Sequence, residues 1–389
     1  MKIVIAPDSF KGSLSAVEAS KSIERGVKKV FPHAEIVLKP MGDGGEGTMD
    51  TLVAVTGGRK KTVWVTDPLG QKVEAEYGVL GDDKTCVIEM ASASGLSLIP
   101  KEKLNPLKTT TYGTGELLKQ ALNDGYYSFI LAIGGSATND GGAGMLQALG
   151  MKILDAENKQ IGFGGEELDK VQSLDMSDFD SRIKASEFII ASDVQNPLIG
   201  QLGASHVFGP QKGASSEDVL LLDSCMTNWA NIVEKHTGVH LHNLPGAGAA
   251  GGIGGAFQAF FPSETRRGID IVIEYSKLNE ALLGADLVIT GEGQVDFQTA
   301  SGKVPMGVAQ AAKSNNVSTV VIAGSIGKGI KELYRFGIVS VNSILNKPMT
   351  LNQAFERASE LVEESSEQIV RTFFHKQINL KKEVLQYEN

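Results

Sequence analysis

Glycine-rich polar loops follow apolar, strand-like runs at several places, and this repeated arrangement constrains the fold more than any other feature of the chain. The first apolar run, 3–5, is followed by APDSFKGSL at 6–14, and comparable loops occupy 41–48, 134–142 and 290–296. In parallel α/β proteins, the loops at the carboxyl ends of the strands bind anions and build the active site. Because carboxylates lie among the glycines, the pattern predicts an α/β protein with a polar cleft.

Strand-like and helix-like segments alternate along the chain. Residues 2–56 are typical of strand, helix, strand and helix, and the first helix, from Ser15 to Phe31, opens with a Ser-x-x-Glu capping box at Ser15 and Glu18. From 60 to 91 the apolar residues recur with period two, which predicts short antiparallel strands. Further strands are expected at 129–133, 188–191, 286–289 and 319–323, and helices at 216–236, 249–261 and from about Thr350 onward.

These segments predict two α/β domains. A doubly wound domain is expected from residues 1–60 together with 285–389, and a mixed α/β domain with an N-terminal β-meander is expected as an insertion at 61–284. A chain of 389 residues is long for a single hydrophobic core, which agrees with this division.

The composition excludes several classes of protein. A net charge of −9 without a basic stripe argues against a nucleic-acid partner. Cys86 and Cys225 are far apart and form no C-x-x-C motif, so neither a disulfide framework nor a cysteine zinc site is expected. The N-terminus lacks a signal-peptide core, and no apolar run approaches the ~18 residues that span a bilayer. We therefore expect a cytoplasmic protein without a membrane partner. Its oligomeric state stays open, with a homodimer among the alternatives.

The sequence contains no strong nucleotide-binding motif. The string GK followed by Ser or Thr never occurs, which excludes a P-loop. A G-x-G-x-x-G string occurs at Gly246, Gly248 and Gly251, but Pro245 precedes it where a Rossmann fold requires a strand. A closely packed helix or a phosphate cradle of backbone N–H groups explains these glycines at least as well as a dinucleotide site.

Three histidines lie close together in the sequence. His236 and His240 are four residues apart, a spacing that can bind zinc on a helix, and His242 follows. Gly238 would interrupt such a helix, and no Glu or Cys is seen to complete the ligand set. Solvated loop histidines are therefore expected.

Charged side chains follow the apolar runs repeatedly. Phosphoryl transfer requires carboxylates as Mg²⁺ ligands and as a proton acceptor for an alcohol, and fixed cations to neutralise the phosphates. The carboxylates in such positions are Asp8, Asp43, Glu46, Asp193, Glu292 and Asp296. The candidate cations are Lys11, Lys212, Arg266, Arg267 and Lys303. Any one of them alone is better explained as a cap, a turn residue or a surface ion pair. Their recurrence at strand ends favours a functional role.

Long strings in this chain resemble the bacterial type I glycerate kinase family. The resemblance spans nearly the whole length and is carried by APDSFKGSL at 6–14, MGDGGEGT at 41–48, YGTGE at 112–116, GGSATNDGGAGMLQALG at 134–150, SDVQNPL at 192–198, FGPQKGA at 208–214, PGAGAAGGIGGA at 245–256, ETRRGID at 264–270 and TGEGQVDFQTASGKVP at 290–305. The resemblance implies ATP- and Mg²⁺-dependent phosphorylation of D-glycerate, generally to 2-phosphoglycerate, with 3-phosphoglycerate as the alternative. It also implies a Rossmann-like or flavodoxin-like domain built from both chain ends, with a second α/β domain inserted.

Individual roles follow from chemistry rather than from the resemblance, and the active site is expected in the cleft between the two domains. Catalytic roles are expected for Asp8, Lys11, Asp193 and Asp296. Substrate binding is expected for Ser9, Asp43, Arg266 and Arg267, since a guanidinium fork matches a carboxylate. Nucleotide binding is expected for Gly134, Gly135, Ser136, Thr138, Gly248, Gly251, Gly252 and Lys303. Glu46 and Glu292 are expected to bind the metal. Which carboxylate is the base and which the metal ligand stays open.

Two rival functions come from other classes. A NAD-dependent hydroxy-acid dehydrogenase would depend on the 246–251 motif alone. A non-catalytic binding protein on the same scaffold would have no reason to keep charged residues in desolvated clefts.

Overall fold

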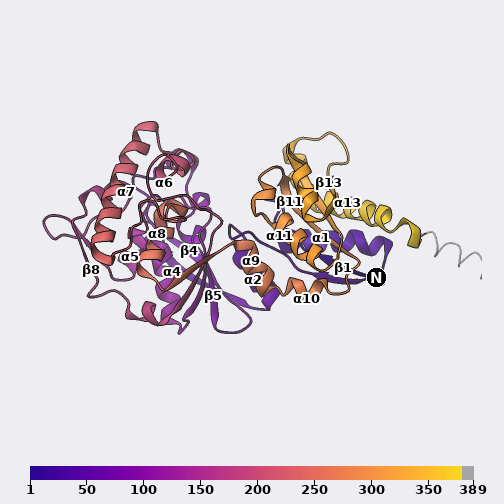
Figure 1. The fold of residues 1–389 in the computed structure, drawn as a ribbon, viewed down its shortest axis with the longest axis horizontal. Coiled ribbons are helices and arrows are strands. Elements are labelled where there is room, and N and C mark those ends of the chain that lie inside the picture. The colour runs from indigo at the N-terminus through magenta and orange to yellow at the C-terminus, as the bar shows by residue number, and fades with distance from the viewer. Residues whose placement is uncertain (379–389) are drawn as a thin grey trace, which may run out of the picture. The chain divides into compact units, whose positions relative to one another are not determined.

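The computed structural model describes residues 1–378 and divides the chain into two compact units (Figure 1). Unit 1 comprises Met1–Asp43 and the chain from Ile269 onward, and unit 2 comprises Gly44–Gly268. These boundaries lie before the domain limits expected at 60/61 and 284/285. The shift has a physical cause: helix α2 (Thr48–Thr56) packs on strands of unit 2, and α10 (Leu278–Leu282) packs on α11 (Val304–Ser314) of unit 1.

Unit 1 is built on a five-stranded parallel sheet of order β13-β12-β11-β1-β2. Its strands are β1 (Lys2–Ile5), β2 (Glu35–Leu38), β11 (Leu287–Val295), β12 (Thr319–Ile326) and β13 (Ile338–Ser343). The N-terminal strand β1 pairs with β2 on one side and β11 on the other, so the indigo and orange segments of Figure 1 share one sheet. The prediction that both chain ends form a doubly wound α/β domain is confirmed.

Helices cover both faces of this sheet. Helices α1 (Ala16–Val30) and α13 (Ala358–Phe373) pack against each other and bury Ile23, Val27 and Leu361 in a core with β1 and β11. Helix α11 packs on β11 and β12, where Ala309 joins a second cluster. The other helices of unit 1 are α9 (Gly268–Tyr275), which begins at the last residue of unit 2, α10 and α12 (Leu351–Glu356).

Unit 2 contains a six-stranded mixed sheet of order β10-β9-β6-β5-β4-β3. Strands β3 (Arg59–Thr66), β4 (Lys72–Val79) and β5 (Thr85–Glu89) are antiparallel neighbours, as the period-two pattern predicted. Strands β6 (Ser128–Ala132), β9 (Glu187–Ala191) and β10 (Ser263–Arg266) continue the sheet in parallel from β5. A separate antiparallel pair is formed by β7 (Lys152–Leu154) and β8 (Ser173–Asp175).

A large apolar cluster of unit 2 includes Tyr77, Phe129 and Trp229. The helices that bury side chains in it are α3 (Ala91–Ser94), α4 (Tyr112–Asn123), α5 (Ala143–Ala148), α7 (Ser216–Thr237) and α8 (Ile253–Phe260). Unit 2 also contains α2 and α6 (Ala204–Phe208). The helix expected at 249–261 begins only at Ile253, as α8, because Ala250 and Gly251 before it have left-handed φ angles of 52° and 70°.

Two local predictions have different outcomes. The capping box is present: Ser15 Oγ accepts from Glu18 N, and the Glu18 side chain accepts from Ser15 N at 2.9 Å. The single long helix expected from Thr350 is instead two helices, α12 and α13, which meet at Arg357. The last part of that expected helix lies outside the described residues. Within residues 1–378, no helix is both long and apolar enough to cross a membrane.

Candidate active site

A cavity of about 610 Å³ lies at the carboxyl end of the parallel sheet of unit 1. Six side chains predicted for the site line it: Asp8, Ser9, Lys11, Asp43, Glu292 and Lys303. They come from the loops after β1 and β2, from β11 and from the start of α11. Because β2, β1 and β11 are adjacent in the sheet, these sequence-distant residues gather at one edge.

The Asp8 carboxyl group is the most deeply buried of the carboxyl groups in this cavity. Asp8 is 5% exposed, and its Oδ1 accepts a hydrogen bond from Ser9 N at 2.6 Å. Its own N–H donates to Gly291 O, which fixes the loop after β1 against β11. Burial, followed by the negative charges of Asp43 and Glu292, raises the pKa of Asp8 to about 8. The cavity therefore concentrates carboxylates that repel one another.

Glu292 points into the same cavity from β11. The strand extends to Val295, so Glu292 lies within it and not in the loop that was expected after residue 289. Its Oε1 accepts from Thr299 Oγ1 at 2.6 Å, and its Oε2 lies 3.7 Å from Lys303 Nζ. Burial raises the pKa of Glu292, while Thr299 and Lys303 oppose that rise. Lys303 is the N-cap residue of α11. The pair combines a fixed anion with a cation beside the cavity.

An apolar wall on the same cavity was not foreseen. It is made of Phe10, Met349, Leu351 and Phe355, together with Leu345 and Ile344. Helix α12 carries part of it and begins with a capping box in which Thr350 Oγ1 accepts from Gln353 N. The sequence signal was present: Thr350 and Gln353 have capping spacing, and Leu351 and Phe355 are four residues apart on one helix face.

Asp296 does not line the cavity, although it was predicted as catalytic. Its Oδ1 accepts from Gln298 N at 2.8 Å and its Oδ2 from Gln294 Nε2 at 2.9 Å. Its backbone N–H donates to Thr299 Oγ1. The side chain thus holds the turn that follows β11.

The remaining predicted carboxylates and arginines belong to unit 2. Asp193 follows β9, and Arg266 and Arg267 end β10 and follow it. The two strands are parallel neighbours with Arg266 opposite Ala191, and Ser192 N donates to Arg266 O at 3.0 Å. Asp193 and the two arginines therefore leave adjacent strand ends. Glu46 lies in the loop before α2.

A buried lysine organises the loop at 134–142. Lys212 is 1% exposed, and its Nζ donates to Ser136 Oγ at 2.7 Å and to Thr138 O at 2.6 Å. Thr138 Oγ1 and Asn139 Oδ1 are buried without a hydrogen-bond partner. Lys212 stood among the candidate cations, but its complete burial could not be predicted from the FGPQKGA string.

Close backbone packing explains the glycines at 248, 251 and 252. A Cβ on Gly251 would lie 2.0 Å from Thr138 O, and one on Gly248 would lie 2.1 Å from Pro197 O. Gly252 likewise approaches Gly141 Cα, and Gly141 N donates to Gly251 O at 3.0 Å. No strand leads into this segment, as a Rossmann fingerprint would require. These glycines let their segment pack closely against the loops that contain Pro197 and Thr138. Their contact with a nucleotide stays a prediction.

Glu89 is a functional candidate that sequence reasoning did not single out. It ends β5 at 8% exposure, and its Oε1 accepts from Met49 N at 2.7 Å, at the start of α2. The N-cap position of α2 is Gly47, which has no side chain. Glu89, at the end of strand β5, therefore supplies the carboxylate that caps this helix. Burial raises the pKa of Glu89 to about 7.

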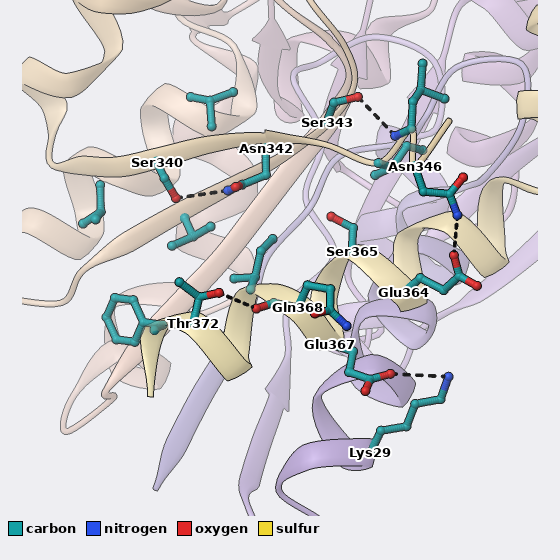
Figure 2. Close-up of a pocket in the computed structure, with 17 residues that line it drawn as sticks. Lys29, Ser340, Asn342, Ser343, Asn346, Glu364, Ser365, Glu367, Gln368 and Thr372 are labelled. Atoms are coloured by element: carbon teal, nitrogen blue, oxygen red, sulfur yellow. Dashed lines mark hydrogen bonds and ion pairs between the residues drawn. The ribbon is translucent and has the colours of Figure 1, made fainter. Parts of the chain in front are cut away.

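A second cavity in unit 1, of about 950 Å³, is larger but carries none of the predicted residues (Figure 2). It lies between the edge strand β13 and helix α13. Its polar side chains bind one another: Asn346 Nδ2 donates to Glu364 Oε2 at 2.7 Å, Asn342 Nδ2 donates to Ser340 Oγ at 3.0 Å, and Lys29 Nζ lies 3.9 Å from Glu367 Oε2. These contacts make it a surface groove without the convergent charges of the smaller cavity.

Comparison with known proteins agrees with this arrangement. The model of the glycerate kinase family matches residues 3–374. The chain is 48% identical to a glycerate 2-kinase of Escherichia coli K12, over 96% of this chain and 98% of that protein. It is 50% identical to a glycerate kinase of Bacillus subtilis 168, over 95% of this chain and 97% of that protein. A crystal structure assigned as glycerate kinase 2 of Salmonella typhimurium LT2 superposes with a TM-score of 0.87 at 47% identity, covering 97% of this chain and 99% of that one.

The family match covers nearly the whole chain, and the relatives are matched over nearly their full length. The earlier dehydrogenase alternative is thereby overturned, in line with the missing strand before Gly246. The chain belongs to the glycerate kinase family and is a phosphotransferase.

Proposed function

We propose that this protein transfers the γ-phosphoryl group of ATP to the 2-hydroxyl of D-glycerate, giving 2-phosphoglycerate and ADP. The observation that carries the proposal is the cavity at the strand ends of unit 1, where Asp8, Asp43 and Glu292 meet Lys11 and Lys303. The 2-position is supported by the E. coli relative, which is named a glycerate 2-kinase.

The donor set of this cavity suits Mg²⁺. Mg²⁺ prefers oxygen ligands, and a divalent cation would relieve the carboxylate repulsion that, after burial, raises the pKa of Asp8. We propose that Glu292 and Asp43 hold the ion. When bound, Mg²⁺ would neutralise phosphate charge during transfer. Glu46, the other predicted ligand, does not line this cavity.

The lysines and the apolar wall together suit ATP. Lys11 and Lys303 are point cations for the phosphates, and Lys303 sits at the N-terminus of α11, where the helix dipole favours anions. The wall that contains Phe10, Met349 and Phe355 provides an apolar surface for the adenine ring. We therefore place ATP in this cavity, with its base toward α12.

The acceptor hydroxyl needs a proton acceptor and an orienting partner. Asp8 is our candidate for the base, because it lies in this cavity and its burial, which a bound ion would not remove, raises its pKa and makes it a stronger proton acceptor than an ordinary carboxylate. Ser9 is its neighbour in the cavity and can hydrogen-bond to a substrate hydroxyl. Asp193 stays the alternative base, and Arg266 or Arg267 the clamp for the glycerate carboxylate.

A coupled assay tests the function directly. The protein is incubated with ATP, Mg²⁺ and D-glycerate, ADP is measured, and the product is passed to enolase without phosphoglycerate mutase. Prompt phosphoenolpyruvate is the expected result. ADP without phosphoenolpyruvate would move the phosphate to the 3-hydroxyl, and no ADP with active protein controls would contradict the proposal.

A further inference from the structure

Three side chains of types that can ligate a metal ion meet in unit 2, on elements that the proposed reaction does not use. They are Glu234, in the last turn of α7, and His240 and His242, in the segment that follows this helix. Glu234 Oε2 lies 3.0 Å from His240 Nδ1 and 3.7 Å from His242 Nδ1. All three ligand atoms lie within 4.8 Å of one another.

Sequence spacing left these histidines without a carboxylate partner, because it compared them only as an i, i+4 pair on a helix that Gly238 interrupts. Gly238 ends α7 in the left-handed conformation, with φ of 77°, and its N–H donates to Glu234 O at 2.8 Å. This cap turns the chain back over the helix end, so that His240 and His242 return to Glu234. Glu234 thus completes the set that spacing alone left without a carboxylate, while His236 takes no part in it.

The orientation of His242 is fixed by a partner on α7. Its Nε2 lies 2.9 Å from Asn231 Oδ1, and an amide oxygen can only accept, so Nε2 carries the proton. Nδ1 therefore presents a lone pair. This atom is buried and has no hydrogen-bond partner, and the His242 side chain is only 13% exposed. A histidine that donates one ring N–H to an oxygen and directs the other nitrogen at a vacant position has the arrangement of a metal ligand.

We propose that Glu234, His240 and His242 form a binding site for a transition-metal ion of the Zn²⁺ class. Tetrahedral Zn²⁺ with bonds of about 2.1 Å requires ligand atoms about 3.4 Å apart, and the two distances to Glu234 Oε2 bracket that value. Two imidazoles with one carboxylate leave the fourth position to water. Imidazole ligands favour Zn²⁺, Ni²⁺ or Cu²⁺ over Mg²⁺, so this site is distinct in chemistry from the proposed magnesium site.

The site lies where a metal ion would tie two parts of unit 2 together. Between its two histidines, Leu241 is fully buried in the core, and His242 O accepts from Ile199 N at 3.4 Å. The same segment leads directly into the glycine-rich stretch at 245–256. A bound ion would join the end of α7 to this segment and stabilise unit 2.

Metal titration of the full-length chain, free of any affinity tag and stripped with a chelator, tests the proposal. Isothermal titration calorimetry with ZnCl₂ should show one saturable equivalent, and Co²⁺ should give the intense visible absorption of tetrahedral coordination. His242→Ala and Glu234→Gln should each weaken Zn²⁺ binding by about 100-fold, and Asn231→Ala by about 10-fold. His236→Ala, which changes an exposed histidine of the same helix, should bind as tightly as the parent.

The contrary reading is that His240 and Glu234 form only a surface ion pair. It predicts no saturable equivalent, or binding that His242→Ala leaves unchanged, and either result would overturn the proposal. Folding of each variant is checked by the fluorescence of the buried Trp229, so that loss of structure is separated from loss of the site.

Discussion

The ammonium group of Lys212 donates to Ser136 Oγ at 2.7 Å from a position with 1% exposure. Burial lowers the pKa of Lys212 to about 7, and the nearby charge of Asp140 opposes that change. The protonated Lys212 is therefore held against the loop at 134–142 at a cost in solvation. This cost makes the stability of unit 2 depend on pH.

We predict that the Lys212 contribution to the free energy of unfolding rises with pH above about 7. Below pH 7 both folded and unfolded chains carry the proton, so the burial cost is fully present. Between pH 7 and the ordinary value of 10.5, the unfolded chain binds a proton that the folded chain does not, so stability increases. From pH 7 to pH 9 the gain is about 2 kcal/mol.

Urea unfolding of the wild type and Lys212→Met checks this prediction. Both tryptophans, Trp64 and Trp229, lie in unit 2, so fluorescence follows that unit. The increase in unfolding free energy from pH 7 to pH 9 should be absent from Lys212→Met. It should be kept in Lys235→Met, which alters an exposed lysine of α7. Equal pH slopes in all three proteins would show that Lys212 is not the source.

Glu89 has the opposite dependence. The pKa of Glu89 is about 7 in the folded chain, above the ordinary value of 4.5. Between pH 4.5 and pH 7 the folded chain therefore holds the Glu89 proton more tightly than the unfolded chain does. Its contribution to stability is therefore largest below pH 4.5 and falls by up to about 3 kcal/mol as pH rises to 7. Glu89→Gln retains an oxygen for Met49 N and should remove this fall. The change in unfolding free energy between pH 5 and pH 8 is measured beside Glu74→Gln, an exposed control on β4. A Glu89→Gln protein with the parent's pH dependence would refute the prediction.

Gly251 should tolerate no side chain. At φ of 70°, a Cβ would lie 2.0 Å from Thr138 O, which is backbone and cannot swing aside. We expect Gly251→Ala to destabilise unit 2 by about 3 kcal/mol or more. Gly125 has a similar φ of 89° with nothing within 4 Å, so Gly125→Ala should cost only the conformational strain, about 1 kcal/mol. Thermal unfolding of the two variants should thus differ clearly, and equal melting temperatures would disprove the packing argument.

The apolar wall predicts a selective effect on ATP. Removing the ring by Phe355→Ala should raise the KM for ATP by about tenfold, because it removes contact area for adenine, and leave the KM for glycerate nearly unchanged. Tyr334→Ala removes an exposed aromatic ring of the same unit that does not line the cavity, and should change neither value. If the two KM values rose together in Phe355→Ala, the wall would not be the adenine surface.

Sequence patterns predicted elements well where local chemistry decides the structure. The box at Ser15 and Glu18 begins α1 as expected, and the apolar runs became parallel strands. Asp8, Asp43 and Glu292 could be expected together, since strand-end loops of one parallel sheet converge.

Features set by tertiary packing could not be predicted in this way. Asp296 has the same strand-end position as the pocket carboxylates, yet a local turn engages it. The burial of Lys212 and Glu89 depends on distant segments that fold over them. The approach of His240 to Glu234 depends on the direction in which the chain leaves Gly238, and residue spacing does not encode that direction.

Phosphoryl transfer in the cavity of unit 1 is tested most directly by the turnover of Glu292→Gln as a function of Mg²⁺ concentration. Glutamine can still accept from Thr299 Oγ1 but lacks the charge that the ion and the lysines require. We predict that kcat falls by about 10²-fold or more and that half-maximal activity needs more Mg²⁺, while Glu332→Gln, on the surface of unit 1, behaves like the parent. A correctly folded Glu292→Gln enzyme with normal kcat and an unchanged Mg²⁺ requirement would contradict the placement of phosphoryl transfer in this cavity.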